Sequence, residues 1–298
     1  MLADAMAERH GSQMMSAWAL VLLGALSVTA HAAPSSSCTV TVSPGDDVQA
    51  ALTAAGPGST VCFAAGPFRI GTPLAPAPGQ TLVGAAGRAS VLDGARIVMG
   101  FTSSGTIRVN RIKVPVFSAP AFLPRKKGNH GFCRIKGCTL QEDVYRDGVP
   151  LTRVLSRSKL VSGAFYASYS RKTMWLLDDP TGRVIEQATA SAIVESETSD
   201  DVTVQGFTIE GAANAAQHGA IHAEGATGWD IADNEVRDNH GTGIIAAPFA
   251  PAANNRFVHD TYHLPSLADG FFAWNDDDLT PAQWVAAGQD TNGTFSSP

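Results

Sequence analysis

The second half of the chain repeats one pattern: a short β-branched run, an Asn or Gly corner, a second short run and a turn. The copies span residues 202–211, 229–239 and 253–260. His240 follows His218 by 22 residues, within the periods of roughly 20–50 residues that are typical of stacked repeats. Each copy is too small to bury its own apolar face, so we expect the copies to stack and form parallel sheets.

Two Gly-rich segments, 218–223 and 240–246, follow the first two copies and predict further strands. Side chains alternate between the two faces of a strand. The residues expected to face the core are Ile221, Ala223, Ile244 and Ala246. The residues expected to face outward are His222, Glu224, Ile245 and Ala247. We place Asn234 and Asn255 at equivalent corners, where stacked Asn side chains satisfy backbone groups.

The N-terminal region predicts a strand, a helix at 46–55 and a second strand. One helical face carries Val48, Ala51, Leu52 and Ala55, with Asp46 or Asp47 as the cap. A stack of repeats has an open apolar end, so we expect this helix to cover it. The helix, PGSTV at 57–61, TLVG at 81–84 and VLDG at 91–94 resemble the opening coils of proteins in the pectin-lyase-like superfamily.

This resemblance implies an all-β fold, a right-handed parallel β-helix with an N-terminal capping helix and an inserted antiparallel β-rich segment. Residues 145–154 predict a hairpin with Asp147-Gly148 at its turn. Near the C-terminus, Thr280 and Pro281 begin a short helix. The expected parts are a signal peptide at 1–32, cap and first coils at 38–130, the insertion at 131–190, coils at 191–265 and a tail at 266–298.

An apolar run of twelve residues, 17–28, is too short for a membrane span of about 20 residues. The small residues Ala30 and Ala32 follow it, so we expect an export signal cleaved after Ala32 or Ala33 and a secreted protein without a membrane span. Acidic residues offset Arg9 in front of the run, which leaves the start codon open.

Four cysteines in an exported chain favour disulfides, with three pairings to choose from. We favour Cys38–Cys62, between the strands that flank the helix, and Cys133–Cys138, which closes a small loop. The net charge of −6 opposes nucleic-acid binding. The resemblance instead implies a polysaccharide partner, an acidic one, and we expect a monomer.

Related lyases remove the proton next to a uronate carboxyl with a Lys, Arg, His or Tyr base, while Ca²⁺ or basic side chains neutralise the carboxylate. Hydrolases instead need two carboxyl groups. Five of the eight histidines lie between 218 and 263. Our candidate catalytic residues are His222, Glu224, His218 and His240, because His218 and His240 occupy the same place in consecutive repeats, where neighbouring strands lie about 4.8 Å apart.

Other residues form a wider constellation with these four. Its further members are Asp238, His259 and Asp260. Ca²⁺ would need converging oxygens, which the run Asp276, Asp277 and Asp278 could supply, although such a run is more often a solvated loop. Three hypotheses stay open: a lyase- or epimerase-like enzyme, a non-catalytic polysaccharide-binding or surface protein, and a truncated remnant of a longer protein.

Overall fold

The computed structural model describes residues 37–104, 107–110, 140–215, 218–247, 254–264, 266–268, 270, 272–274 and 277–297. The described chain is mostly β, with few helices and several parallel sheets. No helix in these ranges is long and apolar enough to cross a membrane. The expected leader at 1–32 and the expected pair Cys133–Cys138 lie outside the described residues.

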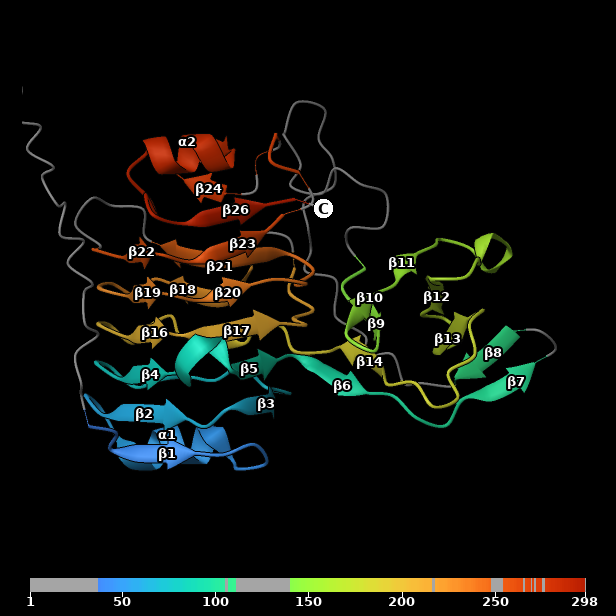
Figure 1. The fold of residues 1–298 in the computed structure, drawn as a ribbon, viewed down its shortest axis with the longest axis horizontal. Helices are drawn as coiled ribbons and strands as arrows, with labels where there is room; N and C mark the ends of the chain where they lie inside the picture. The colour runs from blue at the N-terminus through green and yellow to red at the C-terminus, as the bar shows by residue number, and fades with distance from the viewer. Residues whose placement is uncertain are drawn as a thin grey trace, which may run out of the picture. The chain divides into compact units, whose positions relative to one another are not determined.

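Three parallel sheets hold the repeats (Figure 1). Sheet 1 consists, in order, of β1 (Val40–Val42), β2 (Thr60–Phe63), β4 (Thr81–Val83), β16 (Thr203–Gln205), β19 (Asp230–Ala232) and β22 (Arg256–Val258). Sheet 2 consists of β3 (Gly66–Arg69), β5 (Ser90–Asp93), β17 (Phe207–Glu210), β20 (Glu235–Val236), β23 (Thr261–His263) and β26 (Thr294–Ser296). Sheet 3 consists of β15 (Val194–Glu195), β18 (Gly219–Glu224) and β21 (Thr242–Ala247).

The chain visits the sheets in a fixed order, and we call each such pass a coil. One coil contains β16, β17 and β18, and the next contains β19, β20 and β21. Strand β4 pairs directly with β16, and β5 pairs with β17. The coils before and after the antiparallel strands are therefore neighbours in the stack, although more than a hundred residues separate them in sequence.

Equivalent positions of successive coils stack in register inside the molecule. The inward row of sheet 1 runs through Val40, Val61, Leu82, Val204, Ile231 and Phe257. On sheet 3, Ile221 and Ala223 are fully buried and Ile244 packs against the same core. Burying one such aliphatic side chain stabilises the fold by about 1.5–3 kcal/mol, so the stacked rows account for the cohesion of repeats that could not fold alone.

The first coil is covered by helix α1 (Val48–Ala55). Asp47 caps it by accepting a hydrogen bond from the Ala50 N–H at 2.9 Å, and Val48 and Leu52 are buried in the main core. The helix therefore begins two residues after the expected position 46, because Asp46 accepts a hydrogen bond from the Ser43 N–H in the preceding turn.

The last coil is covered by helix α2 (Pro281–Ala286) and an antiparallel pair, β24 (Phe272–Trp274) with β25 (Asp277–Leu279). Thr280 and Gln283 form a capping box at the start of α2, where the sequence predicted the cap. The Trp284 ring lies 5.1 Å from the Phe257 ring and 4.9 Å from the Phe272 ring. Aromatic side chains thus close the apolar end of the stack.

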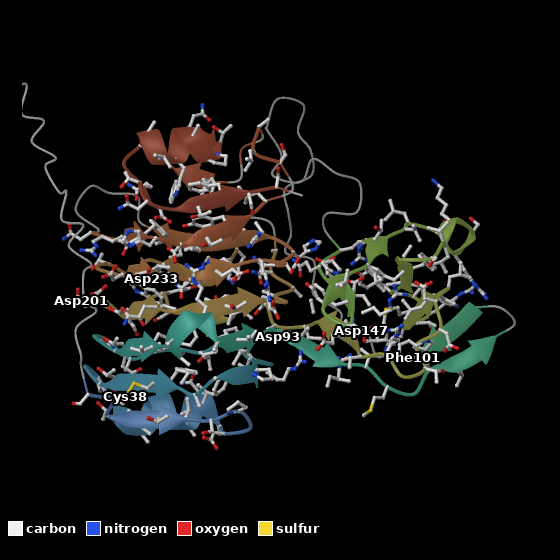
Figure 2. The ribbon with its side chains drawn as sticks, in the orientation of Figure 1. Cys38, Asp93, Phe101, Asp147, Asp201 and Asp233 are labelled. Atoms are coloured by element: carbon white, nitrogen blue, oxygen red, sulfur yellow. A yellow bond between two sulfur atoms is a disulfide. The ribbon has the colours of Figure 1, made fainter. Side chains whose placement is uncertain are left out.

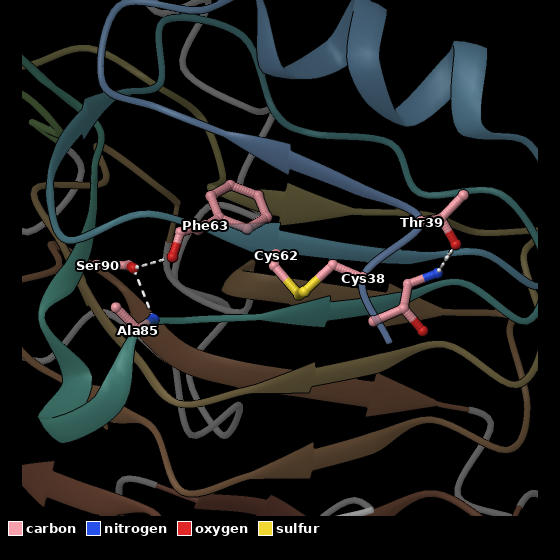
Figure 3. The surroundings of a disulfide bond; sticks show 7 residues. Cys38, Thr39, Cys62, Phe63, Ala85 and Ser90 are labelled. Carbon is pink, nitrogen blue, oxygen red and sulfur yellow. Dashed lines mark hydrogen bonds between the residues drawn. A yellow bond between two sulfur atoms is a disulfide. The ribbon is translucent and has the colours of Figure 1, made fainter. Parts of the chain in front are cut away.

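Figure 3 shows the disulfide Cys38–Cys62, which is the pairing that the sequence favoured. It joins Cys38, two residues before β1, to the neighbouring strand β2, with 5.6 Å between the two Cα atoms. Beside it, the Ser90 hydroxyl donates to the Phe63 carbonyl at 3.1 Å and accepts from the Ala85 N–H at 2.8 Å. These bonds tie the first coils together.

Between β5 and β15 the chain forms a mostly antiparallel module, defined here as the described residues of 95–188. One of its sheets has the order β10 (Val149–Pro150), β9 (Val144–Arg146), β14 (Ile185–Ala188) and β6 (Ala95–Ile97). The other has the order β11 (Thr152–Arg153), β12 (Ala164–Ser168), β13 (Thr173–Leu176), β8 (Ile107–Asn110) and β7 (Thr102–Ser104). The hairpin expected around Asp147-Gly148 is the antiparallel pair β9 and β10.

Antiparallel pairing starts at Ala95, so the module includes residues that the sequence analysis assigned to the first coils. Figure 2 labels Asp93, the last residue of β5, where the chain leaves the coils for the module. The Arg69 guanidinium holds Asp93 and, from β14, Glu186. This triad joins the module to sheet 2 through charge-assisted hydrogen bonds.

The prediction that Asn234 and Asn255 occupy equivalent corners is wrong. Asn234 precedes sheet 2 and accepts a hydrogen bond from the Phe207 N–H at 3.1 Å. Asn255 precedes sheet 1 and accepts one from the Trp229 N–H at 2.9 Å. Both residues do bond the backbone of the coil before them, but at different corners, because a coil turns more than once and short corners resemble one another in sequence.

Candidate functional site

The outer side of sheet 3 brings together two histidines and two glutamates. Glu195 of β15 lies beside His222 of β18 in the strand register, and His218 comes one residue before β18. The rings of His218 and His222 are stacked, with centroids 3.9 Å apart and planes 19° apart. We call Glu195, His218, His222 and Glu224 the sheet 3 cluster.

Hydrogen bonds fix the protonation pattern of this cluster. The Gly219 N–H donates to Nδ1 of His222 at 3.1 Å, so this nitrogen carries a lone pair and the ring proton is on Nε2. Nε2 of His222 lies 3.2 Å from a carboxylate oxygen of Glu224, which accepts that proton. Nε2 of His218 lies 3.1 Å from a carboxylate oxygen of Glu195. Each imidazole therefore has its own carboxylate partner.

His222 is buried, with 2% of its side chain exposed, although the sequence predicted an exposed residue. It does lie on the outer face of β18, but the stacked His218 ring covers it. Burial and the neighbouring His218 lower the pKa of His222. The hydrogen bond from His218 lowers the pKa of Glu195. His218 and Glu195 are 29% and 27% exposed and Glu224 is 65% exposed, so a ligand can reach these three residues of the cluster but not His222.

Glu195 escaped the sequence analysis. Val194 and Glu195 pair with Ile221 and His222, so they form another copy of the strand that we recognised at 218–223. The signal was present in the run Ile193-Val194-Glu195, which has the apolar spacing of the later strands. It lacks the preceding Gly and follows the module directly, and the repeat was therefore not recognised.

We predicted that His240 lies beside His218, and this prediction is wrong. Gly219 pairs with Thr242, which sets His218 level with Gly241 and His240 one residue earlier. Instead, Nδ1 of His240 lies 2.8 Å from Oδ2 of Asp143, a residue of the module. The side chains of His240 and Asp143 are 12% and 30% exposed. This His–carboxylate dyad is formed by residues that are 97 positions apart in sequence.

The dyad continues into a polar network inside the module. Arg153 binds Glu142 at 2.6 Å and approaches the other carboxylate oxygen of Asp143 at 3.8 Å. The Tyr169 hydroxyl donates to Glu142, whose side chain is 1% exposed. Burial and this carboxylate raise the pKa of Tyr169, so the phenol keeps its proton and acts as a donor. These contacts fix Glu142 and Arg153 beside Asp143, the partner of His240.

Asn214 connects the dyad to the sheet 3 cluster. Its Oδ1 accepts a hydrogen bond from the Gly241 N–H at 3.0 Å, next to His240. Its Nδ2 donates to the carbonyl groups of His218 and Thr242. Asn214 is fully buried. The sequence placed His218 and His240 side by side, whereas in the structure the Asn214 amide bonds the backbone of His218 and that of Gly241, the residue after His240.

The remaining residues of the predicted constellation lie elsewhere. His259 is exposed and lies 3.8 Å from Asp233, and Asp260 is buried at the corner before β23. The Asp238 carbonyl accepts a hydrogen bond from Tyr145 at 2.6 Å. Asp276 and the side chains of Asp277 and Asp278, the expected Ca²⁺ ligands, lie outside the described part of the chain.

Two solved structures are similar to part of this chain at low sequence identity. No family model and no curated protein matches the sequence. A solved structure titled "The complex structure of XylC with xylose" is similar over 72% of this chain and 46% of its own, with 13% identity and a TM-score of 0.49. One titled "Glycoside hydrolase" is similar over 75% of this chain and 72% of its own, with 10% identity and a TM-score of 0.45. The chain spans about half the length of the first structure.

Proposed function

We propose that the protein is a secreted right-handed parallel β-helix of the pectin-lyase-like kind that acts on an acidic polysaccharide. The proposed reaction is lyase- or epimerase-like: removal of the proton next to a uronate carboxyl. The observation that carries this proposal is the hydrogen bond between His240 and Asp143, adjacent to the partly exposed pair His218 and Glu195. The capped stack of parallel sheets and the single described disulfide support the fold and the export.

In this mechanism His240 is the base. Asp143 accepts the proton on Nδ1 of His240, which leaves the lone pair on Nε2 and stabilises the imidazolium that forms. The C–H bond next to the uronate carboxyl breaks, its proton goes to Nε2, and its electron pair spreads into the carboxylate. In a lyase these electrons expel the neighbouring glycosidic oxygen, which takes up a proton from water, whereas in an epimerase water returns a proton to the opposite face of the carbon.

The sugar chain would lie along the outer side of sheet 3. Glu195, His218 and Glu224 are accessible there, and His240 lies two residues before β21 of the same sheet. His222 does not react in this mechanism, because the His218 ring covers it. Glu224 accepts the Nε2 proton of His222 and holds that ring in place. His222 thus becomes a positioning residue in this proposal.

The test is turnover on a panel of uronic-acid polysaccharides, with ultraviolet absorbance for unsaturated product and NMR for inverted residues. We expect His240→Gln and Asp143→Asn to lower turnover by roughly 100-fold or more, the usual contribution of a positioned base. His259→Asn is the control, because His259 also lies near a carboxylate, that of Asp233 at 3.8 Å, but is exposed at the corner before β23. Unchanged turnover in His240→Gln would refute the role of the dyad.

A second candidate is a non-catalytic polysaccharide-binding protein. It is favoured by an outward column on sheet 2 that has one polar residue per coil. In this column Arg69 pairs with Asp93, Asp93 with Glu210, and His263 with Ser296, and Arg237 directly follows β20 between them. Arg237 is held by Glu210 at 2.7 Å and by Glu235 at 2.9 Å. Binding of the same polymers without turnover, weakened by Arg237→Ala but not by His240→Gln, would support this function.

A further inference from the structure

The sheet 3 cluster contains a set of donors that fits a metal ion. Glu195, His218 and His222 each offer one ligand atom, and these atoms all lie within 4.8 Å of one another. We propose that these three residues bind a divalent transition-metal ion of the Zn²⁺ and Co²⁺ class. Two imidazoles and one carboxylate suit these ions, whereas Ca²⁺ and Mg²⁺ prefer oxygen ligands.

The surroundings of His222 match those of a metal-binding histidine. The carboxylate of Glu224 accepts the Nε2 proton of His222, and such a carboxylate partner is what orients ligating histidines in known metal sites. The lone pair that would bind the ion is on Nδ1 and is held by the Gly219 N–H at 3.1 Å. The ion therefore has to displace this hydrogen bond. It also takes the place of the proton between His218 and Glu195.

The two imidazole rings must also change their relative orientation. A metal ion lies in the plane of each imidazole that binds it, and two stacked rings direct their lone pairs along parallel lines. His218 is the ring that can turn, because it is 29% exposed and precedes β18, whereas His222 is buried within the strand. This rearrangement opposes binding, so we expect affinity in the micromolar range rather than the tighter range of preformed structural sites.

An ion at this place would give the proposed reaction the cation that it needs to neutralise a uronate carboxylate. Asn214 bonds the backbone carbonyl of His218, one of the three proposed ligands, and the N–H of Gly241, the residue after the base His240. This assignment of a role rests on the proposed function. Binding of the ion does not, because it depends only on the three donors and can be measured with the metal alone.

The experiment titrates untagged, metal-free protein with Co²⁺ and follows the visible d–d absorption, with calorimetry for Zn²⁺. We expect one ion per chain, no competition from excess Ca²⁺, and at least tenfold weaker binding in Glu195→Gln and His218→Gln. Thermal melts of both variants check that they fold. The control is His263→Gln, which changes another partly exposed His–carboxylate pair and should bind like the unchanged protein.

Absence of Co²⁺ bands at millimolar metal, or equal affinity in all three variants, would overturn the metal site. Turnover of a uronic-acid polymer by protein that binds no metal would also overturn it, while leaving the proposed function standing. Stoichiometric binding that is lost in Glu195→Gln and His218→Gln, in a protein that turns over no polymer, would support the site and count against the proposed function alone.

Discussion

The backbone N–H of Asn234 donates to Oδ1 of Asp260 at 2.8 Å, across the same corner of two neighbouring coils. Asn234 repeats this contact with the coil before it, since its Oδ1 accepts from Phe207 and its Nδ2 donates to the Val204 carbonyl at 3.0 Å. In Asp260 the atom that corresponds to Nδ2 of Asn234 is Oδ2. This oxygen is buried and has no hydrogen-bond partner among the described residues. The corner before β23 therefore holds a carboxyl where its geometry suits an amide.

Asp260→Asn should stabilise the protein at neutral pH. Burial, with a contribution from the neighbouring Asp290, raises the pKa of Asp260 well above its ordinary value. A carboxyl with a raised folded pKa favours the fold at low pH, and this stability is lost as the pH rises above the unfolded value of about 3.9. We expect a gain of at least about 1 kcal/mol near pH 8 and little change near pH 4, measured by thermal melts.

Asp233→Asn is the control for that substitution. Asp233 directly precedes Asn234, and its side chain is 64% exposed. Asn tolerates the positive backbone φ of 57° at this position. We expect its melting curves to follow those of the unchanged protein at every pH. A loss of stability in Asp260→Asn across the whole pH range would show that the carboxylate itself is needed at this corner.

Ile221→Asp should unfold the coils, whereas Ile245→Asp should be tolerated. Ile221 is fully buried in the main core, where an unpaired charge costs several kcal/mol. Ile245 pairs with His222 on the outer face of sheet 3 and is only partly buried. Chemical denaturation of both variants measures the difference. The opposite ranking would mean that β18 and β21 both present their other face to the core.

Removing the disulfide should weaken the N-terminal end of the stack. The bond closes a segment in which its two cysteines are separated by 24 positions, and loops of this size contribute about 3 kcal/mol on the chain-entropy model. The double variant Cys38→Ala and Cys62→Ala leaves Cys133 and Cys138 intact, so it isolates this bond better than a reducing agent does. A denaturant titration that showed no loss in the free energy of unfolding would contradict this contribution of the disulfide.

Gly211→Ala should destabilise the protein far more than Gly182→Ala. Both glycines have similar positive φ values, 73° and 68°, so the backbone strain is matched. A Cβ at Gly211 would lie 2.5 Å from Oδ1 of Asp93, whereas nothing lies within 4 Å of one at Gly182. Since Asp93 accepts the Ala95 N–H at 2.7 Å where the module begins, the clash should disturb this junction. Equal melting temperatures for the two variants would contradict it.

Local signals in the sequence were sufficient for much of the framework. The repeated runs predicted parallel strands, and the alternation placed Ile221 and Ala223 in the core. Thr280 and Pro281 indicated the start of α2, and Asp147-Gly148 indicated a hairpin turn. Such features depend on residues a few positions apart, and their physical causes, namely side-chain alternation, capping and turn geometry, are already present in the chain.

The candidate site depends on contacts that no local pattern contains. Asp143 meets His240 only because the module leaves the stack after β5 and returns before β15. His222 is buried because the ring of His218 covers it, although strand alternation places it outside. The lengths of the corners, rather than the strand pattern, place His240 one residue before Gly241, which is the residue level with His218. Sequence therefore determined which residues form strands, and tertiary packing decided which of their side chains meet, because a stack of coils joins positions that only its register and its excursions bring together.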